Sequence, residues 1–212
     1  MACLLVLLFL QSALALPPQF SCFDEALEIS ALPRLLKDCE AVNAWATDSS
    51  NGGLMHGKRP TFWYDLEKHA PPRSSIERAI VDLHKLIPTE MLAGNKTALR
   101  GAEWWVQVRS KDEGIGFHYD KDEGMASLKG IMVHPSLSTV TYLTEAGAPT
   151  LIFDMITPDG NSEIPEIPVD GFLSYPKANR HVIFSGNLQH GVLASAAPPA
   201  SAAARRVTLL IK

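Results

Sequence analysis

The sequence has no excess of basic residues, no internal repeat and few cysteines. Its 212 residues carry 19 Lys and Arg against 23 Asp and Glu, and the net charge of -4 gives no electrostatic reason to bind nucleic acid. A hydrophobic content of 46% with 20% charged residues excludes disordered, collagen-like and coiled-coil proteins. We therefore expect an ordinary folded domain, with or without a helical appendage.

The only long apolar run lies at the start of the chain. An uncharged stretch from Leu4 to Leu10 precedes the small-x-small pattern Ala13-Leu14-Ala15, which is typical of a signal-peptidase site. This predicts a signal peptide over residues 1–15, although no Lys or Arg precedes the apolar run and a buried N-terminal helix is the alternative. No later segment approaches the roughly 18 apolar residues of a membrane span, so we expect no transmembrane segment in the mature chain.

Cysteines and a glycosylation motif agree with export. Removal of the signal peptide would take Cys3 with it and leave Cys22 and Cys39, which either form a disulfide or are two buried thiols. The sequence also contains one N-glycosylation motif, at Asn95. We therefore expect a glycoprotein of the secretory pathway, located in the ER lumen or outside the cell.

The residues from 16 to 100 are predicted to form an N-terminal helical support region. The apolar spacing between residues 20 and 42 indicates short helices around Pro33, and the aromatic residues 62–64 indicate a strand. Ser74 and Glu77 form a capping box, and apolar residues then recur at helical spacing until Pro88. The capping box predicts the most secure helix of this region.

From residue 101 to residue 212 the pattern changes to short β-rich runs separated by turn residues. Eight such runs predict an antiparallel double sheet, that is, a double-stranded β-helix of the jelly-roll or cupin-like type. The Ala- and Pro-rich stretch 194–204 should be a loop between the last two strands. The expected class is mainly β with N-terminal helices (α+β).

A set of metal ligands can be proposed from strand alternation. His118 and Asp120 are two residues apart at the end of an expected strand, so both side chains should face inward. A second histidine, His190, opens a later strand, and two histidines with one carboxylate leave one face of an octahedral ion open. His134 and His181 are rival ligands, but each is better explained by packing or a local hydrogen bond, and His134 could support the site indirectly.

The last expected strand begins with two arginines. In an extended strand Arg206 and Thr208 share one face, whereas Arg205 shares the other face with Val207 and Leu209. A guanidinium suits capture of a carboxylate, such as the far end of 2-oxoglutarate. We therefore expect Arg206, aided by Thr208, to bind that carboxylate.

With these residues in place, the chain resembles the iron(II)/2-oxoglutarate-dependent oxygenase superfamily, most closely its prolyl-hydroxylase-like branch and a group of plant and algal members. The resemblance covers about residues 101–211. It rests on these motifs in this order: EWWVQV, FHYDKDE, MVHPSLSTVTYL, GAPT, GFLSYP, FSGNLQHGV and RRVTLLI. In such relatives the tyrosine of the TYL motif hydrogen-bonds 2-oxoglutarate, and Tyr142 stands at that position here.

The resemblance implies an enzyme, a 2-oxoglutarate-dependent dioxygenase. It would hydroxylate a C–H bond of a peptidyl substrate of the proline or lysine type, or of a small molecule, and release succinate and CO2. Fe(II) would be held by the catalytic residues His118, Asp120 and His190, and 2-oxoglutarate by Arg206, Tyr142 and Thr208. O2 would be the second substrate, and ascorbate is a further candidate cofactor.

Two other functions stay open at this point. One is a non-catalytic, cupin-like secretory protein that binds a metal or ligand. The other is a metal-dependent hydrolase or isomerase, which would need no buried cation opposite the metal and is therefore disfavoured by Arg206. Succinate release that depends on oxygen and 2-oxoglutarate would separate all three.

Overall fold

The computed structural model describes residues 19–48, 60–68, 70–92, 99–156 and 168–212. The expected signal peptide and the glycosylation motif at Asn95 lie outside these residues. Within them, no helix is both long enough and apolar enough to cross a membrane.

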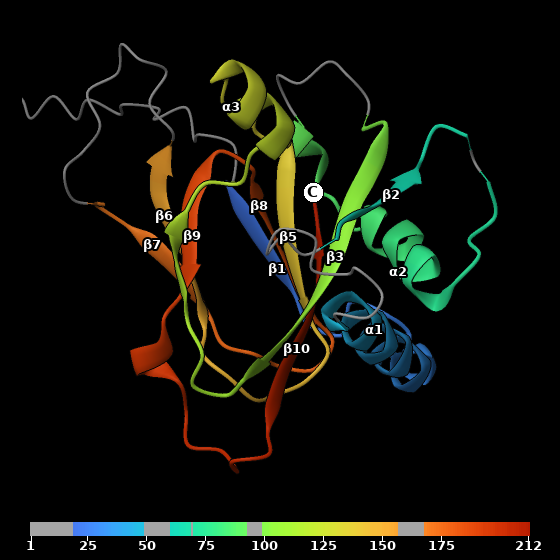
Figure 1. The fold of residues 1–212 in the computed structure, drawn as a ribbon, viewed down its shortest axis with the longest axis vertical. Coiled ribbons are helices and arrows are strands. Elements are labelled where there is room, and N and C mark those ends of the chain that lie inside the picture. Colours follow the sequence, from blue (N-terminus) through green and yellow to red (C-terminus); the bar gives the residue numbers. More distant parts are fainter. Residues whose placement is uncertain (1–18, 49–59, 69, 93–98, 157–167) are drawn as a thin grey trace, which may run out of the picture.

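Two antiparallel sheets face each other and form the body of the molecule (Figure 1). The larger sheet has the strand order β1 (Phe20–Phe23), β8 (Arg180–Ser185), β5 (Leu137–Tyr142), β10 (Arg205–Ile211), β3 (Gly101–Ser110) and β2 (Phe62–Asp65). The smaller sheet has the order β4 (Ile115–His118), β9 (Leu188–Val192), β6 (Thr150–Ile156) and β7 (Gly171–Ser174). This arrangement confirms the predicted mainly β, double-stranded β-helix class.

All eight strands expected after residue 100 form, and β2 confirms the strand expected at residues 62–64. One start differs: β9 begins at Leu188, so His190 lies in the middle of its strand and does not open it. The strand β1 was not expected, because the analysis assigned its surroundings to short helices. It pairs along its whole length with β8, from Phe20 opposite Phe184 to Phe23 opposite His181. Residues before position 100 therefore contribute to the larger sheet as well as to the helices that cover it.

The helices correct one expectation and confirm another. A single helix, α1 (Leu32–Thr47), replaces the short helices expected around Pro33, because Pro33 lies in its first turn, where a missing backbone N–H costs no hydrogen bond. The capping box is confirmed: helix α2 (Ser75–His84) begins after Ser74, whose side chain accepts a hydrogen bond from the Glu77 backbone N–H. A short helix, α3 (Glu123–Lys129), was not predicted from the sequence; Asp122 caps it. Among the described residues there are also three 3-10 helices: η1 (Ile29–Ala31), η4 (Thr89–Leu92) and η5 (Ala194–Ala196), the last within the expected Ala- and Pro-rich loop.

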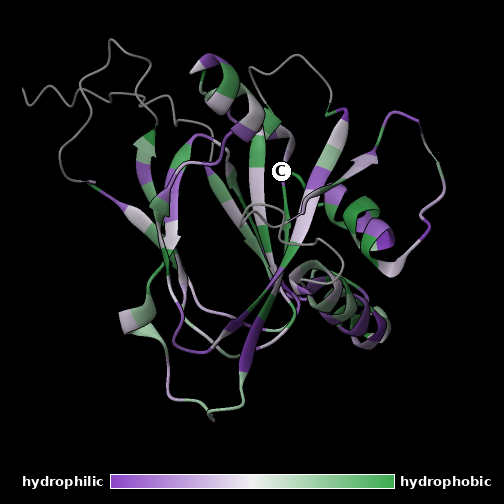
Figure 2. Cartoon of the chain, viewed as in Figure 1, coloured by the Kyte–Doolittle hydropathy of each residue, from purple (hydrophilic) through white to green (hydrophobic). Residues whose placement is uncertain are grey.

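The larger sheet has a hydrophobic core on each face. On the outer face, α1 and α2 pack against β3 and β10, with Leu35, Ile80 and Leu209 fully buried. Between the two sheets lies a second cluster that includes Val140 and Phe184. Figure 2 shows hydrophobic residues along β5 and β10; β10 contributes Leu209 to the outer cluster and Leu210 to the inner one.

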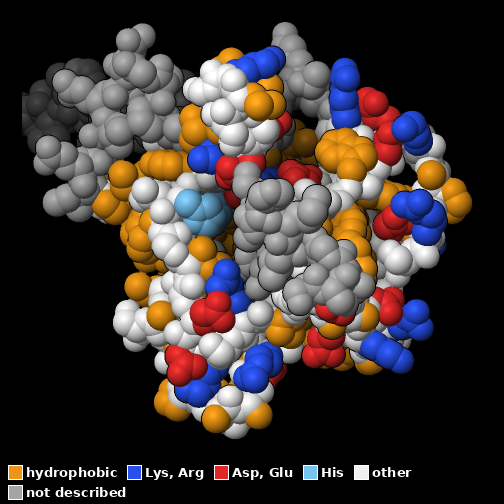
Figure 3. Space-filling view, viewed as in Figure 1, with side chains coloured by type: hydrophobic (Ala, Val, Ile, Leu, Met, Phe, Trp, Pro, Cys, Tyr) orange, Lys and Arg blue, Asp and Glu red, His pale blue; other side chains and the backbone are white. Residues whose placement is uncertain are grey.

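The surface in Figure 3 carries acidic and basic side chains interspersed, without a large patch of one sign. Cys22 is exposed on β1 and Cys39 is buried in α1, and both are free thiols. The disulfide that the sequence allowed is therefore not formed in this structure, and only one of the two thiols is buried.

The lowered pKa of one buried histidine makes the folding stability depend on pH. His181 is fully buried on β8, its Nδ1 lies 2.8 Å from the Thr141 hydroxyl, and burial lowers its pKa to about 3. An unfolded chain takes up this proton near pH 6.5, whereas the folded chain does not, so folding stability should be complete above pH 6.5. It should fall by up to about 1.4 kcal/mol per pH unit as the pH drops toward 3.

Urea unfolding at pH 7, 6 and 5 measures this effect. We expect His181→Asn to lose less stability between pH 7 and pH 5 than the unmodified protein, while the exposed control His84→Asn follows the unmodified protein. Identical pH slopes for His181→Asn and the unmodified protein would show that His181 is not the group responsible.

Candidate metal centre

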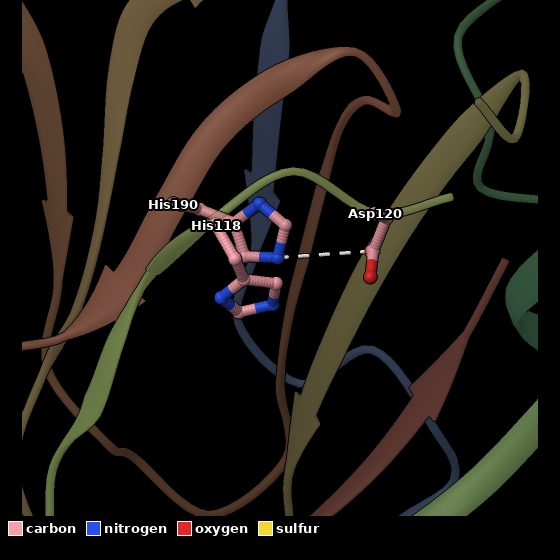
Figure 4. A group of neighbouring side chains, drawn as sticks. All are labelled: His118, Asp120 and His190. Carbon is pink, nitrogen blue, oxygen red and sulfur yellow. Dashed lines mark ion pairs between the residues drawn. The ribbon is translucent and has the colours of Figure 1, made fainter. Parts of the chain in front are cut away.

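Three side chains converge at one end of the space between the sheets. His118 ends β4 and lies directly opposite His190 of the neighbouring strand β9, and Asp120 follows two residues after His118. One ligand atom from each residue lies within 4.8 Å of the others (Figure 4). The Asp120 Oδ2 and His190 Nε2 atoms are 3.6 Å apart. The structure thus brings together the three residues proposed from strand alternation.

Both histidines are held in the tautomer that a metal ligand needs. The Nδ1 atoms of His118 and His190 lie 2.9 and 3.0 Å from the backbone carbonyl oxygens of Gly116 and Leu188. A carbonyl oxygen only accepts, so each Nδ1 carries the proton and each Nε2 presents a lone pair. Burial lowers the pKa of His190, against the opposing effect of the Asp120 charge, which favours the neutral ring that binds metal.

The carboxylate of Asp120 has two supports that the sequence analysis missed. The buried Ser138 hydroxyl donates a hydrogen bond of 2.7 Å to Asp120 Oδ2, and the ammonium of Lys212 lies 3.8 Å from Oδ1. His134 donates from Nδ1 to the backbone carbonyl of Asp120 at 2.5 Å, and it is not part of the group of three residues that could hold an ion. The remaining rival ligand, His181, lies on the other face of the sheet with Thr141.

A small cavity of about 50 Å³ joins this cluster to a buried arginine. Its lining comes from both sheets and comprises Trp105, Gln107, Ile115, His118, Asp120, Thr139, Val140, Thr150, Phe184, His190, Gly191, Val192, Arg206 and Leu210. The site therefore combines three candidate metal ligands and a guanidinium around a single cavity.

The alternation predicted for the last strand is confirmed. Arg206 is 1% exposed, whereas Arg205 is exposed and donates to the backbone carbonyls of Ala202 and Ala204. Within the described part of the chain, no carboxylate forms an ion pair with Arg206, and its Nε has no hydrogen-bond partner. Burial consequently lowers the pKa of Arg206.

The other two residues proposed for this end of the cavity are buried beside Arg206. Thr208 lies two residues further along β10, and its hydroxyl has no partner among the described residues. The Tyr142 ring lies 5.2 Å from the guanidinium, and its hydroxyl is hydrogen-bonded to Thr150 at 2.7 Å and to the Ser174 carbonyl at 3.1 Å. Tyr142 therefore reaches the cavity through Thr150, a residue that the sequence analysis missed.

Thr150 also accepts a hydrogen bond of 2.9 Å from Arg206. Its position could have been recognised from the alternation of β6, because Thr150 and the buried Ile152 share the inner face. The turn before it also shapes the site. Gly147 has a φ of +109°, and a Cβ at this position would lie 2.6 Å from Cβ of Arg206, so glycine lets the turn pack against the arginine stem.

No protein-family model and no curated protein matches this chain. Among solved structures, the chain is similar to a prolyl-4-hydroxylase from Pseudomonas putida, with a TM-score of 0.55 and 16% identity over 91% of this chain and 85% of that one. It is also similar to HygX from Streptomyces hygroscopicus, solved with nickel and 2-oxoglutarate, with a TM-score of 0.50 and 12% identity over 92% and 82% of the two chains.

A third similar structure is SnoN, a non-heme, α-ketoglutarate-dependent epimerase from nogalamycin biosynthesis. Its TM-score is 0.52, with 9% identity over 92% of this chain and 76% of that chain. These neighbours differ in the reaction they catalyse but share a core architecture. The chain therefore has the double-stranded β-helix fold of the iron(II)/2-oxoglutarate-dependent oxygenases.

Proposed function

We propose that this protein is an iron(II)- and 2-oxoglutarate-dependent oxygenase that hydroxylates a C–H bond. The observation that carries the proposal is the single cavity in which His118, Asp120 and His190 face a buried arginine without an acidic partner among the described residues. The substrate would be a peptide with a proline- or lysine-type residue, or a small molecule. O2 would be the second substrate, with ascorbate as a further cofactor.

The residues fit a divalent iron. Two imidazole Nε2 atoms and one carboxylate oxygen form the ligand set that non-haem iron(II) oxygenases use, and they leave the remaining coordination positions open. Ser138 holds the carboxylate by hydrogen-bonding Oδ2, and the backbone carbonyls of Gly116 and Leu188 orient the two rings. HygX, which shares the fold, has also been solved with iron.

The opposite end of the cavity fits a carboxylate. A buried guanidinium without an ion pair is costly, and a ligand carboxylate would supply the missing negative charge. The unpartnered Arg206 Nε and Thr208 hydroxyl are the donors available to it, and Tyr142 with Thr150 keeps the guanidinium in place. Arg206 and Thr208 would therefore bind the far carboxylate of 2-oxoglutarate.

When bound, iron and 2-oxoglutarate supply the oxidising chemistry with O2, and succinate and CO2 are the by-products. The residues of this chain contribute orientation and shielding from water: the histidines and Asp120 hold the metal, and Arg206 directs the cosubstrate toward it. A non-catalytic binding protein would keep these contacts without succinate release, and an epimerase such as SnoN shows that the fold alone does not decide the reaction.

The two adjacent arginines provide a matched test of cosubstrate binding. Arg206→Ala should weaken 2-oxoglutarate binding roughly a hundred- to several-thousand-fold, because loss of one partner of a buried charged pair commonly costs about 3–5 kcal/mol. Arg205→Ala should change it by less than about threefold, as exposed charges typically do. Anaerobic titration of 2-oxoglutarate into the iron(II)-loaded variants, followed by the metal-to-ligand absorption band, measures both. If Arg205→Ala were the weakened variant, the assigned role of Arg206 would be wrong.

Ser138 tests the support of the metal ligands. Ser138→Ala removes the hydrogen bond that orients Asp120, and such outer contacts typically change metal affinity by about 10–100-fold. We expect a loss of this size in iron(II) or cobalt(II) affinity, measured by competition with a chelating dye. The exposed Ser110→Ala on β3 is the control and should bind metal as the unmodified protein does. Equal metal affinity in Ser138→Ala would remove the proposed role of this hydrogen bond.

A further inference from the structure

Three polar side chains form a row across the larger sheet, at the end of the sheet that faces the metal-ligand candidates. Lys212 exchanges two backbone hydrogen bonds with Glu103 of β3, and the register of Ile211 on β5 places Lys212 opposite Ser138. Residues directly opposite in antiparallel strands point to the same face of a sheet. The Ser138 hydroxyl reaches Asp120 between the two sheets, so Glu103 and Lys212 direct their side chains to that face as well.

Four neighbours fix the position of the Lys212 ammonium. It lies 3.8 Å from Asp120 Oδ1 and 4.0 Å from Glu103 Oε2, and the lysine side chain is only 13% exposed. It also lies 3.5 Å from the backbone carbonyl oxygen of Lys121 and 4.9 Å from the centre of the Trp105 ring. A positive charge is therefore held inside the barrel, beside one of the three metal-ligand candidates.

The two carboxylate oxygens of Asp120 have different neighbours. Oδ2 accepts the hydrogen bond of 2.7 Å from Ser138 and lies 3.6 Å from His190 Nε2, the ion pair drawn as a dashed line in Figure 4. Oδ1 is the oxygen that pairs with the Lys212 ammonium. The carboxylate is therefore oriented with one oxygen toward the histidines and the other toward the lysine.

We propose that Lys212 is a positioning residue that keeps Asp120 a one-oxygen metal ligand. A carboxylate can bind a cation through one oxygen or through both, and attraction to the ammonium holds Oδ1 away from the metal position. Oδ2 and the two histidine nitrogens then occupy three of the six positions of an octahedral ion, and three positions stay open. Binding of Oδ1 to the metal would close one of them.

The number of open positions matters for the proposed oxygenase function, on which this inference rests. A 2-oxo acid that chelates the metal needs two positions, and O2 needs a third. If both oxygens of Asp120 bound the metal, the cosubstrate would have to displace one of them. Lys212 thus acts through Asp120, and it controls the affinity for the cosubstrate rather than the affinity for the metal.

A purely structural role of Lys212 predicts a different result. If Lys212 only oriented Asp120, loss of its charge would weaken metal binding, as expected for Ser138→Ala. Removal of a positive charge beside a divalent cation instead favours binding of that cation. The proposal therefore predicts that neutralising Lys212 lowers the affinity for 2-oxoglutarate without lowering the affinity for metal.

The variant Lys212→Met removes the charge and keeps a side chain of similar length. In competition with a chelating dye, it should bind cobalt(II) at least as tightly as the unmodified protein. In the anaerobic titration of the iron(II) form, it should bind 2-oxoglutarate about 10–100-fold more weakly, the size typical of residues that orient a metal ligand. Lys212→Arg should restore the 2-oxoglutarate affinity, and the control Lys129→Met, at an exposed lysine of α3, should change neither affinity.

The coordination of Asp120 can be measured without any cosubstrate. Infrared difference spectra between the cobalt(II)-loaded and the metal-free protein, labelled with 13C at the aspartate carboxyl carbons, give the separation of the two carboxylate stretching bands. This separation is larger for one-oxygen than for two-oxygen coordination. The unmodified protein should show the larger separation and Lys212→Met the smaller one.

Equal band separations in these two proteins, or weaker cobalt(II) binding by Lys212→Met, would overturn the proposal. A different result would reject the oxygenase function instead. If the unmodified protein showed one-oxygen coordination and Lys212→Met showed two-oxygen coordination, but neither bound 2-oxoglutarate, the role of Lys212 at the metal would stand and the proposed cosubstrate would be wrong.

Discussion

The pairing of β10 with β3 on one edge and with β5 on the other is the constraint on which the site depends. Val207 and Leu209 pack under α1 and α2, so Arg206 and Thr208, which alternate with them along the strand, face the other sheet. A slip of one residue would bury Arg205 and expose the apolar face of the strand. The core against the helices therefore holds the register that places Arg206 and Thr208 inside the barrel.

Burial of the Arg206 charge destabilises the folded protein, and this suggests that a ligand binds there. Arg206 is desolvated without an acidic partner among the described residues, although Thr150 and the Tyr142 ring stabilise it. Burial of an unpaired charge destabilises a folded protein, and a ligand that supplies the opposite charge restores stability through its binding energy. The metal-ligand candidates at the other end of the same cavity support the proposed ligand, a dicarboxylate that also chelates metal.

Strand alternation and local capping explain why much of the fold could be predicted from the sequence. The eight β-rich runs, the capped helix α2 and the inward face of Arg206 depend on neighbours in sequence. The missed features depend on partners that are distant in sequence. The strand β1 forms because β8 offers an edge, and Ser138 supports Asp120 only once β5 lies beside the end of β4.

The contact of Lys212 with Asp120 also depends on partners that are distant in sequence. The ammonium of Lys212 lies beside Asp120 only after β10 has paired with β3. The disulfide considered for Cys22 and Cys39 is a pairing that the sequence allowed but that the structure does not contain. Cysteine number and compartment allowed it, but the structure places one thiol on an exposed strand and the other inside a helix. Pairing of side chains across the fold is the information that local patterns lack.

The central claim is that the protein oxidises its substrate at this cavity in a reaction that depends on 2-oxoglutarate. The most direct measurement is succinate formed from 2-oxoglutarate by the iron(II)-loaded protein, with and without O2, beside the His190→Ala variant. The account predicts succinate that requires both iron and O2 and that falls to background in His190→Ala, whose fold should remain intact by circular dichroism. Equal succinate from His190→Ala, or none from an unmodified protein shown to bind iron and 2-oxoglutarate, would contradict it.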